Sequence, residues 1–492
     1  MFIRSFPDRK GYEKLASEHN VVAVCSEILA DMDTPVSLLR KFFCPGRDCF
    51  LFESMEGTAR WGRYSFLGLS SRARVLVYRD RVEIHNGVQR EVIPHGGDPL
   101  AVLREFMSRF KVALSPELPR FQGGMVGYFT YETVSFFENI PNRLDENAVM
   151  AEFMMPDEMI IFDNVRHTLM CVVLTFIGKG DDISLCYDNA VQRLTKMTDD
   201  IQRPFRAIEV RRQRDLNLRP VEPDDVYRKN VAKTKEMIFD GEIIQAVIAQ
   251  SFEADAPGDP TALYRAMRFI NPSPYLYFMH FGGMTICGAS PETMVRLEGT
   301  RACVRPIAGT RPRGCDETQD RILADELLKD EKEKAEHLML VDLGRNDLGK
   351  VAVTGTVQVT DLMFIERYSH VMHLVSNVEC DMREGLDCFD LFRATFPAGT
   401  LSGAPKVRAM EIIAGLEKTP RGPYGGAVGY IAFGGNMDFA ITIRTAVIEG
   451  EKLTVHAGAG IVADSDPETE RMETVNKARA IERALHFIGD RC

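Results

Sequence analysis

The spacing of hydrophobic residues changes along the chain. Apolar, β-branched runs at 21–30, 74–85 and 167–178 indicate strands, whereas the segment 99–114 has a helical pattern. Another strand, opened by glycines, is expected at 121–133. Up to about Asn217 the sequence therefore predicts short strands that alternate with helices.

The second half contains three strand-like runs close together, at 428–433, 439–448 and 452–457. Glycine or Gly-Asn turns separate them, as in antiparallel meanders. The stretch "YGGAVGY" at 424–430 also repeats the texture of "FQGGMVGYFTYET" at 121–133. Two such stretches hint at an internal duplication but do not establish a repeat.

Two helices are expected in this half. The first runs from about 317 to 343, with apolar residues at Ile322, Leu327, Ala335, Leu338 and Val341. The second begins near "DSDPETE", where Ser465 or Asp466 caps it and Pro467 fits its first turn. Its buried stripe is predicted to comprise Met472, Val475, Ala478, Ile481, Leu485 and Ile488.

Strands and helices here do not alternate as βαβ units. The pattern therefore favours an α+β fold with large, mostly antiparallel β-sheets over a doubly wound fold. A basic connector at 203–220 lacks aromatic residues for stacking on bases and is interpreted as a solvated link. We predict an N-terminal region, 1–217, and a C-terminal region, 218–492, interwoven in one large fold.

Composition limits the class of protein. Of the 492 residues, 45% are hydrophobic and 27% charged, as in globular proteins. The net charge of −11 disfavours nucleic acid as a partner, and no apolar run is long enough to span a membrane. Eleven cysteines lack CxxC pairs, and the N-terminus is too charged for a secretory signal. We expect a cytoplasmic protein with neither nucleic-acid nor membrane partners.

Carboxylates occur in two helical pairs. Glu333 and Glu336 are three residues apart, and so are Glu470 and Glu473. Because residues at i and i+3 share a helical face, each pair can point at one spot. Facing pairs would hold a hard cation and leave positions for water and an anionic substrate. Taken alone, these pairs are more simply explained as two solvated charged faces, which helices commonly have.

Other residues have the chemistry of an anion site. Arg444 is expected on a strand among apolar neighbours, where its guanidinium needs a carboxylate partner, either internal or from a ligand. Gly458 and Gly460 let backbone N–H groups approach an oxyanion, or simply form a turn. His373 is a candidate proton shuttle; with His370 it is also a zinc pair, but one without a third ligand at a familiar spacing.

The stretch "TFPAGTLSGAPK" does not fit a nucleotide-binding loop. A GxxxxGK[ST] loop leads directly into a helix, and Pro405 prevents that helix register, which excludes an NTPase. The hydroxyl of Thr400 remains available to bind a ligand. No nucleophile elbow is present, so covalent acyl transfer and a fused glutaminase are not indicated.

The order and wording of these motifs resemble the chorismate-utilising enzymes. The resemblance rests on "GASPETMVRLEG", "RPIAGTRPRG", "AEHLMLVDLGRNDLGKV", "RYSHVMHLVS", "TFPAGTLSGAPKVRAMEII", "YGGAVGY" and "AGAGIVADSDPETE". It covers residues 223–488 and is looser before them, where it depends on "FLFES" and "FQGGMVGYFTYE". It implies an α+β fold of large, mostly antiparallel β-sheets, stacked face to face with helices outside, around Mg²⁺-bound chorismate.

The resemblance also implies roles for individual residues. Glu336 and Glu473 would bind Mg²⁺, with Glu333 and Glu470 beside them through water. The substrate's carboxylates and ring would be held by Gly309, Thr310, Thr400, Tyr424, Arg444, Gly458, Ala459 and Gly460. His373 would act on the departing 4-hydroxyl and then transfer a proton as pyruvate leaves.

The implied reaction adds ammonia at ring C2 of chorismate and eliminates pyruvate to give anthranilate, the first step of tryptophan biosynthesis. Gln245 would position ammonia, whereas the water-adding isochorismate and salicylate synthases carry a lysine at the matching place. In C4-aminating relatives the loop at 305–314 resembles "PIKGT", whose lysine attacks the ring. Ala308 stands at that place here and so favours direct amination at C2.

Regulation and assembly are implied in the same way. Tryptophan would inhibit by binding Ser54, Pro274, Tyr275 and Leu276, the last in place of the usual methionine. Ser251 also replaces a common arginine. A separate glutamine amidotransferase subunit, component II, would supply ammonia in a hetero-oligomer. Three alternatives stay open: amination at C4, amination without pyruvate loss, and an inactive protein that senses chorismate or tryptophan.

Overall fold

The computed structural model describes residues 2–54, 62–204, 216–368 and 371–489. Its helices are α1 (Arg9–Ala16), α2 (Pro35–Phe42), α3 (Pro99–Ser108), α4 (Ile183–Gln202), α5 (Asp224–Phe239), α6 (Pro260–Ile270), α7 (Glu317–Lys329), α8 (Glu331–Gly349), α9 (Cys388–Thr395), α10 (Lys406–Leu416) and α11 (Pro467–Gly489), with the short 3₁₀ helices η1 (Tyr131–Phe136) and η2 (Gly399–Leu401).

The strands of the first region are β1 (Phe2–Phe6), β2 (Val21–Leu29), β3 (Cys49–Glu53), β4 (Tyr64–Val77), β5 (Arg81–Asn86), β6 (Gln89–Pro94), β7 (Val112–Ala113), β8 (Gly124–Phe129), β9 (Ala151–Asp163) and β10 (Thr168–Phe176). Those that follow are β11 (Arg219–Pro220), β12 (Gln245–Asp255), β13 (Tyr275–Phe281), β14 (Met284–Ser290), β15 (Thr293–Glu298), β16 (Arg301–Val304), β17 (Ile307–Pro312), β18 (Gln358–Arg367), β19 (Val371–Asp381), β20 (Gly403–Ala404), β21 (Ala427–Ala432), β22 (Met437–Ile441), β23 (Thr445–Glu449) and β24 (Lys452–Ile461).

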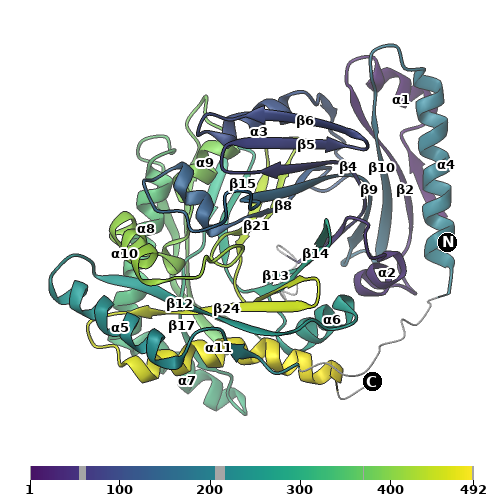
Figure 1. The fold of residues 1–492 in the computed structure, drawn as a ribbon. Helices are drawn as coiled ribbons and strands as arrows, with labels where there is room; N and C mark the ends of the chain where they lie inside the picture. Colours follow the sequence, from purple (N-terminus) through teal and green to yellow (C-terminus); the bar gives the residue numbers. More distant parts are fainter. Residues whose placement is uncertain (1, 55–61, 205–215, 369–370, 490–492) are drawn as a thin grey trace.

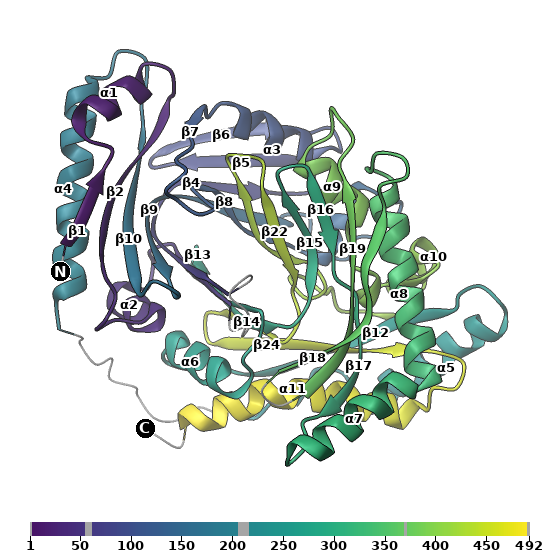
Figure 2. The ribbon, with the colours of Figure 1, turned by 180° about the vertical axis from the view of Figure 1, so that it is seen from behind.

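The strands join into one hydrogen-bonded network with the helices on its outside. Among the described residues, strand pairs are antiparallel except the short β2–β7 pair. Figure 1 shows α4 along the outer side of β10 and α11 beneath β24, and Figure 2 shows the same arrangement from behind. The predicted α+β class with large, mostly antiparallel sheets is confirmed.

Strands β2 and β10 are covered on both faces, and their sequences are therefore almost continuously apolar. Val22 and Val24 belong to a hydrophobic cluster shared with α2, α4, α6 and α11. Val21 and Ala23, on the opposite face, belong to a second cluster that includes residues of β13, β14 and β21. Successive side chains of a strand point to opposite faces, so a strand covered on both sides needs apolar residues at every position.

The two predicted regions share strand pairs. Strand β3 pairs with β13, and β8 pairs with β21. In the second pair Gly127 lies opposite Gly429, so the two similar glycine-rich stretches are neighbours in space. A Cβ at Gly127 would lie 1.9 Å from a backbone oxygen of Glu152, which explains the need for glycine there.

The predicted helix at 317–343 is wrong in its continuity. It is divided into α7 and α8 at Asp330, whose backbone is extended and whose carboxylate caps α8. The division changes which face is covered: Leu327 and Val341 are buried, but Ile322, Ala335 and Leu338 are exposed. By contrast, the predicted stripe of α11 is buried or half-buried throughout.

Two further boundaries differ from the prediction. The helix at 99–114 ends at Ser108, because residues 112–113 form β7 instead. The predicted strand at 439–448 is divided into β22 and β23, and Arg444 lies in the break with a φ of 51°. Arg444 is therefore not on a strand, and the left-handed turn of its backbone directs the chain around a cavity.

Candidate active site

A cavity with about 920 Å³ of empty space lies between β12, β24 and the helices α8 and α11. Its lining includes eight of the residues expected to act on substrate or metal: Gln245, Glu336, Thr400, Tyr424, Arg444, Gly458, Gly460 and Glu473. These residues come from parts of the chain more than 200 residues apart. The structure thus brings most of the predicted site together in one place.

The carboxylates reach this cavity from two capped helices. Asp330 begins α8, and Asp466 accepts a 2.9 Å hydrogen bond from the Thr469 amide at the start of α11. Glu336 lines the cavity from α8 and Glu473 from α11. Burial, and then the charge of neighbouring Glu333, raises the pKa of Glu336. Burial likewise raises the pKa of Glu470.

These carboxylates are not gathered into a ready-made metal cluster. Among the described residues, no three His, Cys, Asp or Glu side chains are arranged to hold a metal ion. Glu473 instead pairs with Lys477 at 2.7 Å, and Glu333 with Arg311 at 3.4 Å. Mg²⁺ is commonly held by only one or two carboxylates, with water and substrate oxygens as its other ligands. Glu336 and Glu473, facing one cavity, fit that donor set.

Two cations from the described ranges line the cavity: Lys477, which pairs with Glu473, and Arg444. The Arg444 side chain makes no hydrogen bond or ion pair with a protein carboxylate in the described part of the chain. Burial lowers its pKa from the ordinary value, an effect opposed by Tyr424 and Glu473. The internal salt bridge considered from the sequence is therefore not formed among these residues. A desolvated guanidinium of this kind has its strongest partner in a ligand carboxylate.

Tyr424 and the glycines of β24 form the wall beside Arg444. The Tyr424 hydroxyl lies beside the backbone of Gly458, and both residues line the cavity. A Cβ at Gly458 would lie 2.7 Å from that hydroxyl, and one at Gly460 would lie 2.3 Å from the Gln245 side chain. A side chain at Gly460 would therefore displace the Gln245 amide, and one at Gly458 would displace the Tyr424 hydroxyl. Ala459, between them, is fully buried and does not line the cavity.

Gln245 lies at the first position of β12 and is 4% exposed. Its side-chain N–H donates to Glu336 at 3.3 Å, while its carbonyl oxygen is buried without a partner among the described residues. An unpaired buried acceptor is unfavourable unless a ligand donates to it. The Gln245 carbonyl oxygen is therefore free to accept a hydrogen bond from a ligand in the cavity.

Glu292 was missed by the sequence analysis. It lines the cavity, is 8% exposed, and accepts a 3.0 Å hydrogen bond from the Thr400 hydroxyl. Burial raises the pKa of its carboxyl to about 8, so it holds a proton near neutral pH. The only signal was its place in "GASPET", where a single glutamate lacks the helical spacing that drew attention to the other four.

His373, Gly309 and Thr310 are brought together beside the cavity, on β17 and β19, rather than in its lining. His373 Nδ1 lies 3.1 Å from the Gly309 carbonyl oxygen and 3.1 Å from the Thr310 hydroxyl. Burial lowers the pKa of His373, so its ring is neutral with the proton on Nδ1. Ala308 is 9% exposed, and Ile307, not Ala308, lines the cavity. His370 lies outside the described residues.

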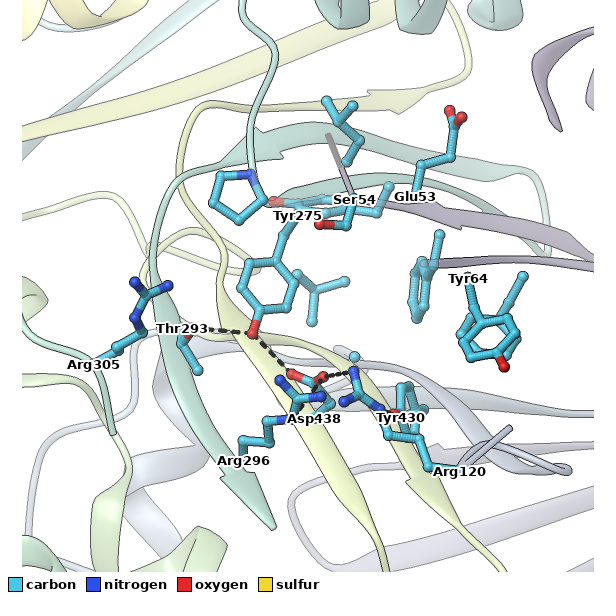
Figure 3. Close-up of a pocket in the computed structure, with 17 residues that line it drawn as sticks. Glu53, Ser54, Tyr64, Arg120, Tyr275, Thr293, Arg296, Arg305, Tyr430 and Asp438 are labelled. Atoms are coloured by element: carbon cyan, nitrogen blue, oxygen red, sulfur yellow. Dashed lines mark hydrogen bonds and ion pairs between the residues drawn. The ribbon is translucent and has the colours of Figure 1, made fainter. Parts of the chain in front are cut away.

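A second cavity, with about 690 Å³ of empty space, is lined by all four residues predicted to bind tryptophan: Ser54, Pro274, Tyr275 and Leu276. Figure 3 shows Ser54 and Tyr275 at one side of it, with Arg120 and Asp438 below. The Tyr275 hydroxyl donates to Asp438 at 2.9 Å and contacts the Thr293 hydroxyl at 3.0 Å.

The second cavity combines aromatic and charged groups. Phe52, Tyr64, Phe66 and Tyr430 provide aromatic surface. Arg120 donates to Asp438 at 2.9 Å, and burial raises the pKa of Asp438. Leu276 belongs to the hydrophobic cluster shared with α6, so its neighbours on that side are apolar. Such a cavity suits a flat aromatic ligand that also carries charged groups.

Residues 49–483 match the model of the chorismate binding enzyme family, and the chain belongs to this family. It is 43% identical to anthranilate synthase component 1 of Acetivibrio thermocellus, with 99% of each chain covered. It is 46% identical to the component 1 of Pseudomonas putida, over 97% of this chain and 98% of that one. The crystal structure of component I from Streptococcus pneumoniae has a TM-score of 0.77 and 32% identity, covering 92% of this chain and 99% of that one.

No helix among the described residues has the length and apolar character needed to cross a membrane.

Proposed function

We propose that the protein is the chorismate-converting component of an anthranilate synthase and acts in tryptophan biosynthesis in the cytoplasm. The observation that supports this most directly is that Arg444, half-buried and without a carboxylate partner among the described residues, lines one cavity together with Glu336 and Glu473. Chorismate carries two carboxylates on a small ring. Arg444 can bind one of them, and Mg²⁺ held by Glu336 and Glu473 would bind the other. Relatives more than 40% identical over nearly their full length are anthranilate synthase components.

Substrate binding follows from the cavity walls. Arg444 and Tyr424 hold the enolpyruvyl carboxylate, and the amides around Gly458 and Gly460 line the same pocket. Glu336 and Glu473 are the residues that would hold Mg²⁺. When bound, Mg²⁺ supplies positive charge opposite the ring carboxylate and the charge that develops in the transition state.

Amination requires a nucleophile at C2 and a proton for the leaving group. Gln245 accepts a hydrogen bond from ammonia through its unpaired carbonyl oxygen and thereby positions the nitrogen lone pair. As the C2–N bond forms, both ring double bonds shift, from C1=C2 to C1=C6 and from C5=C6 to C4=C5, and the 4-hydroxyl leaves. Glu292, protonated and held by Thr400, gives that hydroxyl the proton that converts it to water.

Elimination of pyruvate then needs a base. The neutral ring of His373 has its Nδ1–H engaged by Gly309, which leaves Nε2 to take the proton from C2. The C3–O bond to the enolpyruvyl group breaks, the ring becomes aromatic, and the departing enolate takes a proton from His373 on its methylene carbon to become pyruvate. We therefore assign leaving-group protonation to Glu292 and the second proton transfer to His373.

Regulation and assembly complete the proposal. Tryptophan would bind in the second cavity between Ser54 and Tyr275, with its indole among the aromatic side chains and its charged groups near Arg120 and Asp438. A glutamine amidotransferase subunit would supply ammonia in a hetero-oligomer. Support for tryptophan binding comes from the resemblance and from the composition of the second cavity, and support for the amidotransferase subunit comes from the resemblance and from the component 1 names of the relatives.

The direct test mixes the purified chain with chorismate, Mg²⁺ and an ammonium salt at alkaline pH and follows anthranilate fluorescence and pyruvate together. Equal amounts of both products are expected. Amine without pyruvate would indicate the truncated reaction, and a 4-amino product would contradict amination at C2. Glutamine is expected to replace ammonium only after an amidotransferase subunit is added.

A further inference from the structure

Arg421 is a buried guanidinium behind the catalytic cavity. It lies in the loop between α10 and β21, three residues before Tyr424, and its side chain is 2% exposed. It does not line the cavity itself. A charge this deeply buried needs several well-aligned partners, since desolvation opposes it strongly.

Two of the residues that the Arg421 guanidinium binds, Val247 and Leu401, line the cavity, and the third, Glu417, follows α10. Nε and Nη2 donate to the two oxygens of Glu417, both at 2.7 Å. Nη1 donates to the carbonyl oxygen of Leu401 at 2.7 Å, and Nη2 to that of Val247 at 2.7 Å. Leu401 follows Thr400 in η2, and Val247 is two residues after Gln245 in β12. The planar fork therefore joins two walls that carry proposed catalytic residues.

The third wall is the loop that contains Arg421 itself. The guanidinium lies 4.4 Å from the ring centre of Tyr131 and 5.8 Å from that of Tyr424. The carboxylate of Glu132 accepts the backbone N–H of Arg421 at 2.7 Å and that of Gly422 at 3.1 Å. The loop is therefore held in two ways: Glu132 of the N-terminal region binds its backbone, and the Arg421 side chain anchors it to the cavity walls.

We propose that Arg421 is a positioning residue that sets the mutual placement of Thr400, Gln245 and Tyr424 in the catalytic cavity. A lysine reaches fewer of these partners at once, because it lacks the planar fork that serves a carboxylate and two carbonyl groups together. Displacement of a substrate-holding group by about 1 Å lowers turnover roughly a hundredfold. The proposal depends on the proposed function for its kinetic measurement.

The test compares Arg421→Lys with Arg104→Lys. Arg104 has the same bidentate geometry, to Asp387 at 2.6 and 2.9 Å, but lies outside both cavities. With wild-type turnover established, kcat is expected to fall about a hundredfold in Arg421→Lys and less than threefold in Arg104→Lys, although both lower the midpoint of thermal unfolding. Equal kcat and KM in Arg421→Lys and wild type would overturn the proposal and leave Arg421 a structural residue only.

A second measurement is independent of turnover. Amide hydrogen exchange at 400–402 and 424–426 is expected to become faster in Arg421→Lys and to stay unchanged in Arg104→Lys. Unchanged exchange in Arg421→Lys would contradict the positioning role of Arg421, whether or not the wild-type chain is active. An inactive wild-type chain would contradict only the proposed function. If Arg421→Lys does not fold, Glu417→Gln replaces it, because it keeps the side-chain volume and weakens the contact with Nε. Its expected loss of kcat is about tenfold, with the same change in exchange.

Discussion

The hydroxyl of Thr400 donates a 3.0 Å hydrogen bond to Glu292 inside the catalytic cavity, and the residue after Glu292 lies in the other cavity. There Thr293 contacts the Tyr275 hydroxyl at 3.0 Å. Two consecutive residues therefore connect the proposed sites of catalysis and inhibition. A ligand that displaces Tyr275 would therefore act on Thr293, the first residue of β15, which directly follows Glu292.

Replacing Glu292 by glutamine tests its role as the acid. Glutamine keeps the contact with Thr400 but cannot give a proton to the departing hydroxyl, so kcat is expected to fall by a factor of 10² to 10⁴. In wild type, kcat for chorismate with saturating ammonia should decline as the pH rises through about 8, the pKa of this carboxyl. A Glu292→Gln variant that retains both full activity and this decline would exclude Glu292 as the acid.

The same group affects stability with a definite sign. Between its ordinary pKa of 4.5 and about 8, Glu292 is protonated in the folded protein and ionised in the unfolded chain. The folded state binds more protons, so the free energy of unfolding decreases as pH rises through this window. Glu292→Gln should reduce that decrease, as measured by urea unfolding at pH 5, 6, 7 and 8. An unchanged slope would show that the carboxyl ionises normally.

The metal prediction concerns Glu336 and Glu473. Chelation of divalent cations should abolish anthranilate formation, and added Mg²⁺ should restore it. Glu473→Gln and Glu336→Gln should each raise the Mg²⁺ concentration for half-maximal activity at least tenfold, because each removes one charged ligand. Glu468→Gln, on the same helix but paired with Arg228 and Arg471, is the control and should not change it. Full activity in the presence of chelator would contradict the metal assignment.

The inhibition prediction concerns Tyr275. Tyr275→Phe removes the hydroxyl that joins Asp438 and Thr293 but keeps the ring. The tryptophan concentration for half-inhibition, with each protein compared to its own uninhibited rate, should rise at least tenfold. Tyr12→Phe, which removes a 2.9 Å hydrogen bond to Thr175 elsewhere, should show the wild-type value. If tryptophan inhibits both variants equally, the Tyr275 hydroxyl does not contribute to the inhibitor site.

Local patterns were sufficient to predict the strand-rich character, the cap of α11 and its buried stripe, because caps and periodicity depend on neighbouring residues. The two glutamate pairs were also predictable, since their spacing fixes a helical face. The break at Asp330 was not predictable, although its cause is local. The apolar residues on both sides have the spacing of one continuous helix, and only the turn at Asp330 changes which side of the second helix is buried.

Other features depend on packing between distant segments. The break at Arg444 interrupts an apolar run that reads as one strand, and only the cavity beside it explains the left-handed backbone. Glu292 gains its raised pKa from burial by elements far away in sequence, which a motif does not report. The second cavity likewise joins residues 52–54, 64 and 66 to residues from 274–305 and 428–438. The family resemblance predicted four residues of this cavity, whereas the hydrophobic periodicity gave no indication of the cavity.

Ala308→Lys tests how the protein avoids covalent attack on the ring. Ala308 is nearly buried in β17 opposite Leu374, next to the cavity-lining Ile307. Burial lowers the pKa of a lysine here, so a neutral, nucleophilic amine is expected. Anthranilate formation should fall at least tenfold. The intact protein should also gain the mass of chorismate less one water, because the amine bonds to the ring as the 4-hydroxyl leaves.

Ala308→Met is the matched control, because it adds similar length without an amine. Both substitutions overfill the space and should lower stability by about 1–3 kcal/mol, which thermal unfolding measures. Only the lysine variant should form the adduct, detected by mass spectrometry after incubation with chorismate and Mg²⁺. If the lysine variant makes anthranilate at the rate of the methionine variant and no adduct forms, position 308 does not decide where the ring is attacked.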